Sequence, residues 1–254
     1  MKKKNVILVL IILLLATAVL CGFLFVRAYV TAREEMSEYS DVQREYTSVV
    51  SAPVPATSDD HGEDPGNDHA PAATDGLPYV TADFDALLLE NPDTVGWLAI
   101  PDTVISYPIV QASDNAKYLN VSFLGKRSSA GTLFTDAANN MRDLDANTVL
   151  YGHNMGFGRK DMFGSLLSYK DKDFYEAHRY IQFDTIYQRY GWWKVFAVIA
   201  HDIRSETKEP SLYESDTDLS PDDLILTLST CDRSIYGKDG RLLVLAVNMS
   251  SFLP

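Results

Sequence analysis

The residues best suited to covalent chemistry lie at the ends of two predicted strands. The first run, Leu224–Thr230, is rich in apolar and hydroxyl residues and is followed at once by Cys231. Turn-forming residues come next, and a second apolar run, Arg241–Val247, begins ten residues after the cysteine. This order predicts a thiol at the end of one strand and a guanidinium at the start of its neighbour.

Cys231 is the only thiol of the globular part, because the other of the two cysteines, Cys21, lies in a long apolar segment. A cysteine that is alone in its domain has no intramolecular disulfide partner. It is then an intermolecular partner, a buried spectator or a reactive thiol. The reactive form is the thiolate, which requires a nearby cation or base, and Arg241 lies just across the loop.

His153 is the strongest candidate for the base among the three histidines of the globular part. It follows a predicted strand and stands among Gly152, Asn154 and Gly156, where backbone can approach a substrate. His178 is expected at a helix end or on the surface, and His201 at a strand end.

The first 27 residues predict a cytoplasmic tip and a transmembrane anchor. Lys2–Lys4 precede Asn5–Val26, 22 residues without a charge, which is long enough to cross a bilayer. The preceding lysines favour a cytoplasmic N-terminus and an extracytoplasmic remainder, making a single-pass cell-membrane protein. Ala18–Gly22 resembles a lipoprotein cleavage site, but bulky Leu20 favours an uncleaved anchor.

Residues 28–78 predict a juxtamembrane segment followed by an acidic linker. Ala28–Val50 is polar and can form a helix that rests on the domain, whereas Ser51–Pro78 has six acids, no lysine or arginine and little apolar surface. The linker is therefore expected to be disordered. Beyond the first 30 residues, 18 bases face 35 acids, which argues against nucleic-acid binding.

Residues 79–254 are a normal length for one globular domain, and their pattern is mainly β. Short strands with few helices predict a closed or nearly closed eight-stranded β-barrel with peripheral helices. The predicted strands are 95–100, 104–110, 131–134, 147–151, 180–183, 191–201, 223–230 and 241–247. The predicted helical segments are 81–91, 114–120, 161–167 and 171–178.

Three segments together resemble a sortase, a membrane-anchored cysteine transpeptidase of Gram-positive bacteria. They are Thr227–Cys231, Arg241 ten residues later, and Tyr151–Met155. Further details resemble class B of that family. They are Asn91–Trp97, Asp114–Asn115 with Tyr118–Leu119, Ser129–Gly131, and Phe174–Tyr175 through His178 to Phe183–Asp184.

The resemblance implies a sortase-type barrel and a thiol-dependent acyl transfer. Cys231 would be the nucleophile, His153 the general acid and base, and Arg241 the stabiliser of the oxyanion. The groove for the substrate would be lined by Asn115, Leu119, Tyr151 and Ser229. The expected partners are a surface protein with an NPxT-like or LPxT-like sorting signal and the amine of a peptidoglycan precursor, lipid II. No cofactor or metal is implied.

Two departures from class B bear on specificity. The connection Asp202–Asp222 is only about twenty residues long, where class B members usually have a long helix that helps to form the groove. Arg233 stands where some members carry an acid, and neither it nor Asp232 is assigned a catalytic role. The sequence is compatible with four functions: attachment to the cell wall, pilin polymerisation with a lysine acceptor, hydrolysis, and a non-catalytic adhesion or scaffold domain.

Overall fold

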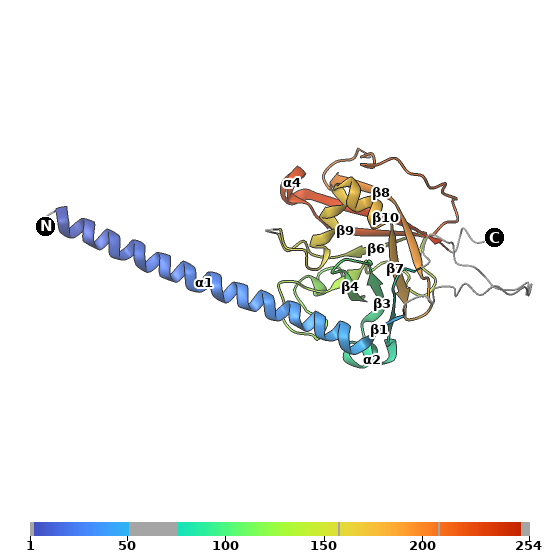
Figure 1. The fold of residues 1–254 in the computed structure, drawn as a ribbon, viewed down its shortest axis with the longest axis horizontal. Coiled ribbons are helices and arrows are strands. Elements are labelled where there is room, and N and C mark those ends of the chain that lie inside the picture. The colour runs from blue at the N-terminus through green and yellow to red at the C-terminus, as the bar shows by residue number, and fades with distance from the viewer. Residues whose placement is uncertain (1–2, 51–75, 157, 208, 250–254) are drawn as a thin grey trace, which may run out of the picture.

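Eight strands close into a barrel in the computed structural model, which describes residues 3–50, 76–156, 158–207 and 209–249 (Figure 1). The expected eight-stranded barrel is thereby confirmed. The strands are β3 (Thr94–Ala99), β4 (Ser106–Val110), β5 (Leu133–Thr135), β6 (Asn147–Tyr151), β7 (Tyr180–Thr185), β8 (Trp192–Asp202), β9 (Ile225–Cys231) and β10 (Gly240–Asn248).

The order around the barrel is β10-β8-β7-β3-β4-β5-β6-β9. Two neighbouring pairs, β4–β5 and β6–β9, are parallel, and the other pairs are antiparallel. The barrel therefore places β9 between β6, a parallel neighbour distant in sequence, and β10, which follows it along the chain.

The strand sequences match this arrangement. In β10, the buried residues Leu242, Val244 and Ala246 alternate with partly exposed ones, which is the period-two pattern of a strand with one face on the core. β3 is buried along its whole length and carries Trp97 and Leu98. One large apolar cluster results, and it holds the barrel closed from inside.

The helical segments lie outside the barrel. They are α2 (Phe84–Glu90), η2 (Lys117–Leu119), η3 (Phe163–Lys170), α3 (Lys172–Ala177), α4 (Arg233–Tyr236) and η4 (Gly237–Asp239). The helix expected from residue 81 begins only at Phe84, because Tyr79–Ala82 forms strand β2 and Asp83 caps the helix. The helix expected to open at Asp161 is a 3₁₀ helix that starts at Phe163 instead. The turn expected after Cys231 contains the short helices α4 and η4.

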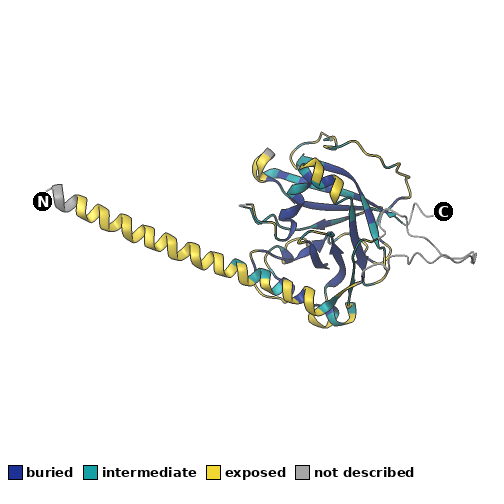
Figure 2. Cartoon of the chain, viewed as in Figure 1, coloured by how far each residue is buried: buried dark blue, intermediate teal, exposed yellow. Residues whose placement is uncertain are grey.

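The N-terminal part is one continuous helix, α1 (Lys3–Tyr46), which crosses the boundary expected at residue 27 (Figure 1). Its apolar part is long enough to span a membrane, with a mean hydropathy of 3.1. The side chains of residues 7–31 are exposed, and only the last turns of the helix reach the barrel (Figure 2). Strand β1 (Thr47–Val50) follows and pairs antiparallel with β2. Residues 51–75 of the expected linker lie outside the described residues.

The connection after β8 packs as an irregular segment along the outside of the barrel. Leu212 donates its amide to the Val198 carbonyl at 2.7 Å, and Tyr213 stacks on Tyr175 of α3. Asp216 forms ion pairs with Arg179 and Lys194. In its described residues this connection contains no helix, in agreement with its short length and its two prolines.

Candidate active site

The parallel pairing of β6 with β9 brings His153 next to Cys231. Tyr151 pairs with Ser229 in this register, so the residues two positions further along both strands meet beyond the strand ends. Hydrogen bonds continue the pairing, from the Gly152 amide to the Ser229 carbonyl at 3.2 Å and from the Asn154 side chain to the Cys231 carbonyl at 2.9 Å. The backbone thus fixes the separation of the imidazole and the thiol.

Arg241 lies on the other side of Cys231. It is the direct partner of Cys231 in the antiparallel pairing of β9 with β10. Its guanidinium donates to the carbonyls of Gly240 and Lys238, at 2.9 and 3.2 Å. Cys231 therefore lies on a central strand with a base candidate on one neighbour and a permanent cation on the other.

Arg241 has no carboxylate at ion-pair distance among the described residues. The two nearby acids are engaged elsewhere: Asp232 pairs with Lys170 at 2.8 Å, and Asp239 with Arg204 at 3.3 Å. The guanidinium keeps donors that are not neutralised by an acid, which is what a group that stabilises a developing oxyanion requires.

A backbone carbonyl orients the His153 ring. The Nε2 atom lies 2.8 Å from the Leu119 carbonyl oxygen. Because a carbonyl can only accept a hydrogen bond, Nε2 carries the proton in this contact, and Nδ1 is left to exchange a proton with a reacting group. In this site a main-chain oxygen takes the orienting position that a carboxylate occupies in many catalytic triads.

All seven residues that the sequence singled out line one cavity of about 280 Å³. They are Asn115, Leu119, Tyr151, His153, Ser229, Cys231 and Arg241. Gly152, which the sequence places beside His153, also lines the cavity, and so do three residues that sequence reasoning did not name, which are Thr132, Phe134 and Thr230. Gly152 also has a packing role, because a Cβ there would overlap Leu133 and Phe163.

Asp136 is a residue of this region that sequence reasoning missed. One of its carboxylate oxygens accepts hydrogen bonds from the Asn115 amide at 2.9 Å and from the Tyr151 hydroxyl at 3.0 Å. The hydrogen bond from the Ala138 amide, aided by these two, holds the pKa of Asp136 below its usual value against the effect of burial. An ionised Asp136 therefore joins two walls of the cavity, and only the fold brings these three residues together.

The residue after the cysteine, Asp232, is structural. Its side chain is buried, caps α4 through the Ser234 amide and accepts a hydrogen bond from Lys170. Burial alone would raise the pKa of Asp232, but the hydrogen bonds from Lys170 and Ser234 outweigh it and lower the pKa. Asp232 thus attaches the loop after Cys231 to η3.

The other two histidines lie away from the cavity. His178 ends α3, where its ring stacks on Phe174 and Nδ1 lies 2.9 Å from the Phe174 carbonyl. His201 is in β8 and pairs with Arg241, so it lies one strand further from Cys231 than Arg241 does.

Comparison with known proteins gives consistent matches. The family model described as the sortase domain matches residues 98–249. Sortase B of Staphylococcus aureus (strain NCTC 8325 / PS 47) is 29% identical over 264 residues, covering 97% of this chain and 98% of that protein. Sortase B of Listeria monocytogenes is 37% identical over 172 residues, covering 61% of this chain and 69% of that protein.

Solved structures agree with the sequence matches. The crystal structure of sortase B from B. anthracis in complex with AAEK1 superposes with a TM-score of 0.64 at 29% identity, covering 86% of this chain and 98% of that one. A sortase B–substrate complex from S. aureus has a TM-score of 0.58 at 31% identity, covering 65% and 83%. The chain therefore belongs to the sortase family of cysteine transpeptidases, and its relatives are of the sortase B type.

Proposed function

We propose that this sortase cleaves a C-terminal sorting signal after a threonine and joins the surface protein to the amine of a cell-wall peptidoglycan precursor. The observation that carries the proposal is the placement of Cys231 on β9 between His153, beyond the end of β6, and Arg241 on β10. The cavity beside these residues gives a substrate chain access to the thiol.

The first half of the reaction forms a thioacyl enzyme. The Cys231 thiolate attacks the carbonyl carbon of the threonine, and the carbonyl oxygen becomes a tetrahedral oxyanion. The Arg241 guanidinium donates hydrogen bonds to this oxyanion. Protonated His153 gives its proton to the leaving amine, the peptide bond breaks, and the C-terminal part of the signal departs.

The second half transfers the acyl group. A primary amine attacks the thioester and gives its proton to His153, a new amide bond forms, and the Cys231 thiolate is released. Both half-reactions use only the named side chains and the two substrates. In this scheme Asn115, Leu119, Tyr151 and Ser229 hold the signal, because they line the same cavity as the thiol.

An amine acceptor is also consistent with a relative. One sortase B structure was solved in complex with triglycine, a short peptide with a free amine. Lipid II as the amine donor is our proposal for this chain. A lysine amine of a pilin subunit requires the same chemistry, and transfer assays with the two kinds of amine separate the two functions.

The N-terminal helix supports a membrane location. Its residues Ile7–Val26 are apolar and exposed, as expected for a segment that lies in lipid. Lysines before the span favour a cytoplasmic N-terminus and an extracytoplasmic barrel. Protease added to intact protoplasts should then degrade the barrel, whereas protection until lysis would contradict this orientation.

The function is tested with the full chain in detergent micelles. NPxT-like and LPxT-like peptides are supplied with triglycine, with a lysine side-chain amine, or with water alone, and the products are identified by mass spectrometry. We expect cleavage after threonine and transfer to triglycine. Dominant transfer to lysine would favour pilin polymerisation, and release of acid alone would favour a hydrolase.

Two variants test the assigned roles. Cys231→Ala should fold normally and form no acyl-enzyme, whereas a non-catalytic surface domain would keep its function. His153→Ala should fold and lose at least about 100-fold in rate, the usual scale for a general acid–base. Near-normal turnover of Cys231→Ala would refute the proposed mechanism.

A further inference from the structure

The end of α1 belongs to the catalytic domain as well as to the anchor. Two of its residues, Tyr39 and Val42, are each only 3% exposed and belong to the main apolar cluster of the barrel. The rest of the helix is mostly exposed (Figure 2). Apolar contacts alone would be enough to attach the helix to the barrel. The contact nevertheless buries a polar group, the hydroxyl of Tyr39.

The Tyr39 hydroxyl is bound on three sides by a single segment of the barrel, residues 121–132. It donates to the Gly131 carbonyl, lies 3.1 Å from the Thr132 hydroxyl and accepts from the Phe123 amide at 3.3 Å. Its ring meets Tyr107 of β4 edge to face, with centroids 5.6 Å apart. One side chain of α1 thus fixes both ends of this segment.

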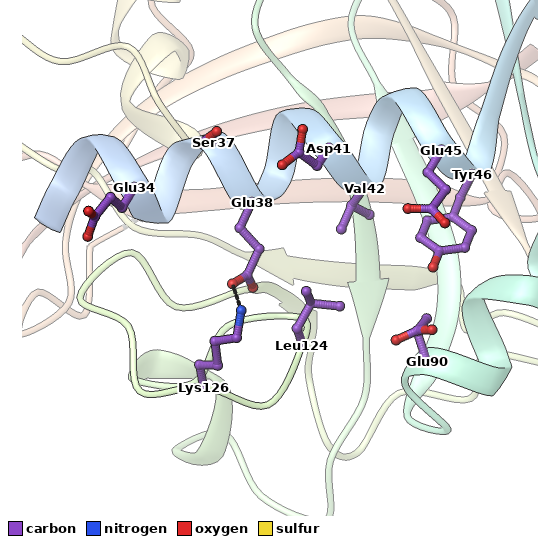
Figure 3. A pocket seen from close by; sticks show the side chains of 10 residues that line it. All are labelled: Glu34, Ser37, Glu38, Asp41, Val42, Glu45, Tyr46, Glu90, Leu124 and Lys126. Carbon is purple, nitrogen blue, oxygen red and sulfur yellow. Dashed lines mark hydrogen bonds and ion pairs between the residues drawn. The ribbon is translucent and has the colours of Figure 1, made fainter.

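Two carboxylates of α1 hold the same segment from outside. Glu35 accepts hydrogen bonds from the amide and the hydroxyl of Ser129, at 3.0 and 2.8 Å. Glu38 pairs with Lys126 at 3.0 Å, and Figure 3 shows the Glu38 side chain extending from α1 toward Lys126. These contacts are more exposed than those of Tyr39, so they should contribute less to the stability of the attachment between α1 and this segment.

The segment that α1 holds carries part of the catalytic cavity. Thr132 lines the cavity, and its amide donates to the Tyr118 carbonyl at 3.0 Å. The residue after Tyr118, Leu119, also lines the cavity, and its carbonyl binds His153. Gly131 (φ +59°) lies so close to the carbonyls of Tyr118 and Leu119 that a Cβ would not fit. A displacement of the backbone at Gly131 and Thr132 therefore also displaces the backbone at Leu119.

We propose that Tyr39 is a positioning residue for the transfer reaction. It holds Gly131 and Thr132 against Leu119 and thereby sets the wall of the cavity and the acceptor that orients His153. This inference rests on the proposed function, since it assumes that the cavity binds the sorting signal. It goes further by making the membrane-proximal helix a part of the substrate site.

The test compares two variants of the full chain that lose the same atom. Tyr39→Phe removes the hydroxyl and keeps the ring on Tyr107. Tyr46→Phe makes the same change seven residues later on the same helix, where the side chain lies near Glu90 of α2 (Figure 3) and does not line the catalytic cavity. All proteins carry Cys21→Ser, so that Cys231 is the only thiol.

The expected result is a lower kcat/KM for the sorting peptide with an unchanged reactivity of the Cys231 thiol. Tyr39→Phe should lower kcat/KM for the sorting peptide by about tenfold, through KM because the cavity wall shifts and through kcat because His153 loses its orientation. Alkylation of Cys231 by iodoacetamide should keep its rate, because the small reagent needs no groove. Tyr46→Phe should match the parent protein in both assays. Both assays are run well below the melting temperature of every variant.

Other outcomes distinguish this inference from the proposed function. If both variants keep kcat/KM within about twofold of the parent, Tyr39 only attaches the helix and the inference is overturned. If Tyr39→Phe does not fold, Glu35→Gln is measured in its place. We expect kcat/KM for the sorting peptide to fall about threefold in this variant, and an unchanged kcat/KM would overturn the inference. If the parent transfers no peptide, the proposed function fails. Hydrogen exchange of residues 119–132 then decides: faster exchange in Tyr39→Phe supports the contact, and unchanged exchange overturns it.

Discussion

Replacing Arg241 with lysine should separate catalysis from stability. The change keeps the positive charge but exchanges a planar fork of donors for one flexible ammonium. In the folded protein, Arg241 donates to two backbone carbonyls, those of Lys238 and Gly240, and forms no ion pair with a described carboxylate. An arginine that served only as surface charge would be expected to pair with Asp232 or Asp239, and both have other partners.

The two effects differ enough in size to be measured. Each hydrogen bond to a carbonyl is worth about 1 kcal/mol net, and lysine can keep one of them, so Arg241→Lys should cost at most about 1 kcal/mol of stability. For a domain of this size that corresponds to a fall of about 2–4 °C in Tm. Loss of an oxyanion donor costs about 100- to 1,000-fold in kcat, or about 2.7–4 kcal/mol.

The assay is thermal unfolding and peptide transfer measured on the same preparation of the full chain. Transfer should fall about 100-fold while Tm changes by a few degrees. Transfer at the parent rate would reduce Arg241 to a surface charge. A large loss of Tm together with a proportional loss of transfer would make it a structural residue, and either result would refute the argument from the strand pairing.

Two further predictions concern carboxylates near the site. Asp136→Asn should raise KM for the sorting peptide several-fold, because an amide has only one acceptor oxygen and cannot keep the hydrogen bonds from Asn115 and Tyr151 together with the one from the Ala138 amide. Asp145→Asn is the control, because Asp145 contacts Asn139 and Asn140 outside the cavity, and it should leave KM unchanged. Asp232 has a lowered pKa in the folded state, so its stabilisation is complete above the unfolded pKa of about 4 and is lost as the pH falls through the folded pKa. Asp232→Asn should therefore lose less stability than the parent between about pH 5 and pH 2 in urea unfolding, and an unchanged pH dependence would contradict this assignment.

The strands can be predicted from the sequence because each carries its own pattern. Asn147–Tyr151 is predicted with the bounds that the structure has, and the other barrel strands differ by a few residues at their ends. The cavity residues are also found, since Cys231, Arg241 and His153 follow or begin such strands. Local composition and a resemblance to a family are sufficient for these features.

What the sequence does not reveal depends on contacts between distant residues. Strand β2 lies where the sequence predicts the start of a helix, because its partner β1 lies about thirty residues away across the linker. Asp136 has no feature of its own that indicates a link between Asn115 and Tyr151. The order β6-β9-β10 likewise depends on a parallel pair separated by 78 residues, and no local pattern reports that pairing.

The boundary between anchor and enzyme lies inside α1, and this follows from burial. Composition places the change near residue 27, where the apolar run ends, and the linker suggests a domain that starts near residue 79. In the structure, the apolar anchor and the segment that rests on the barrel are one helix, α1. A protein starting at Tyr79 would expose the surface that Tyr39 and Val42 cover, leave the edge of β2 without β1, and leave the Phe123 amide without its acceptor. An exposed strand edge and an unsatisfied amide both favour aggregation or local rearrangement near the cavity. A soluble form used to measure transfer should therefore retain α1 from about Thr31 onward, together with the linker that connects β1 to β2.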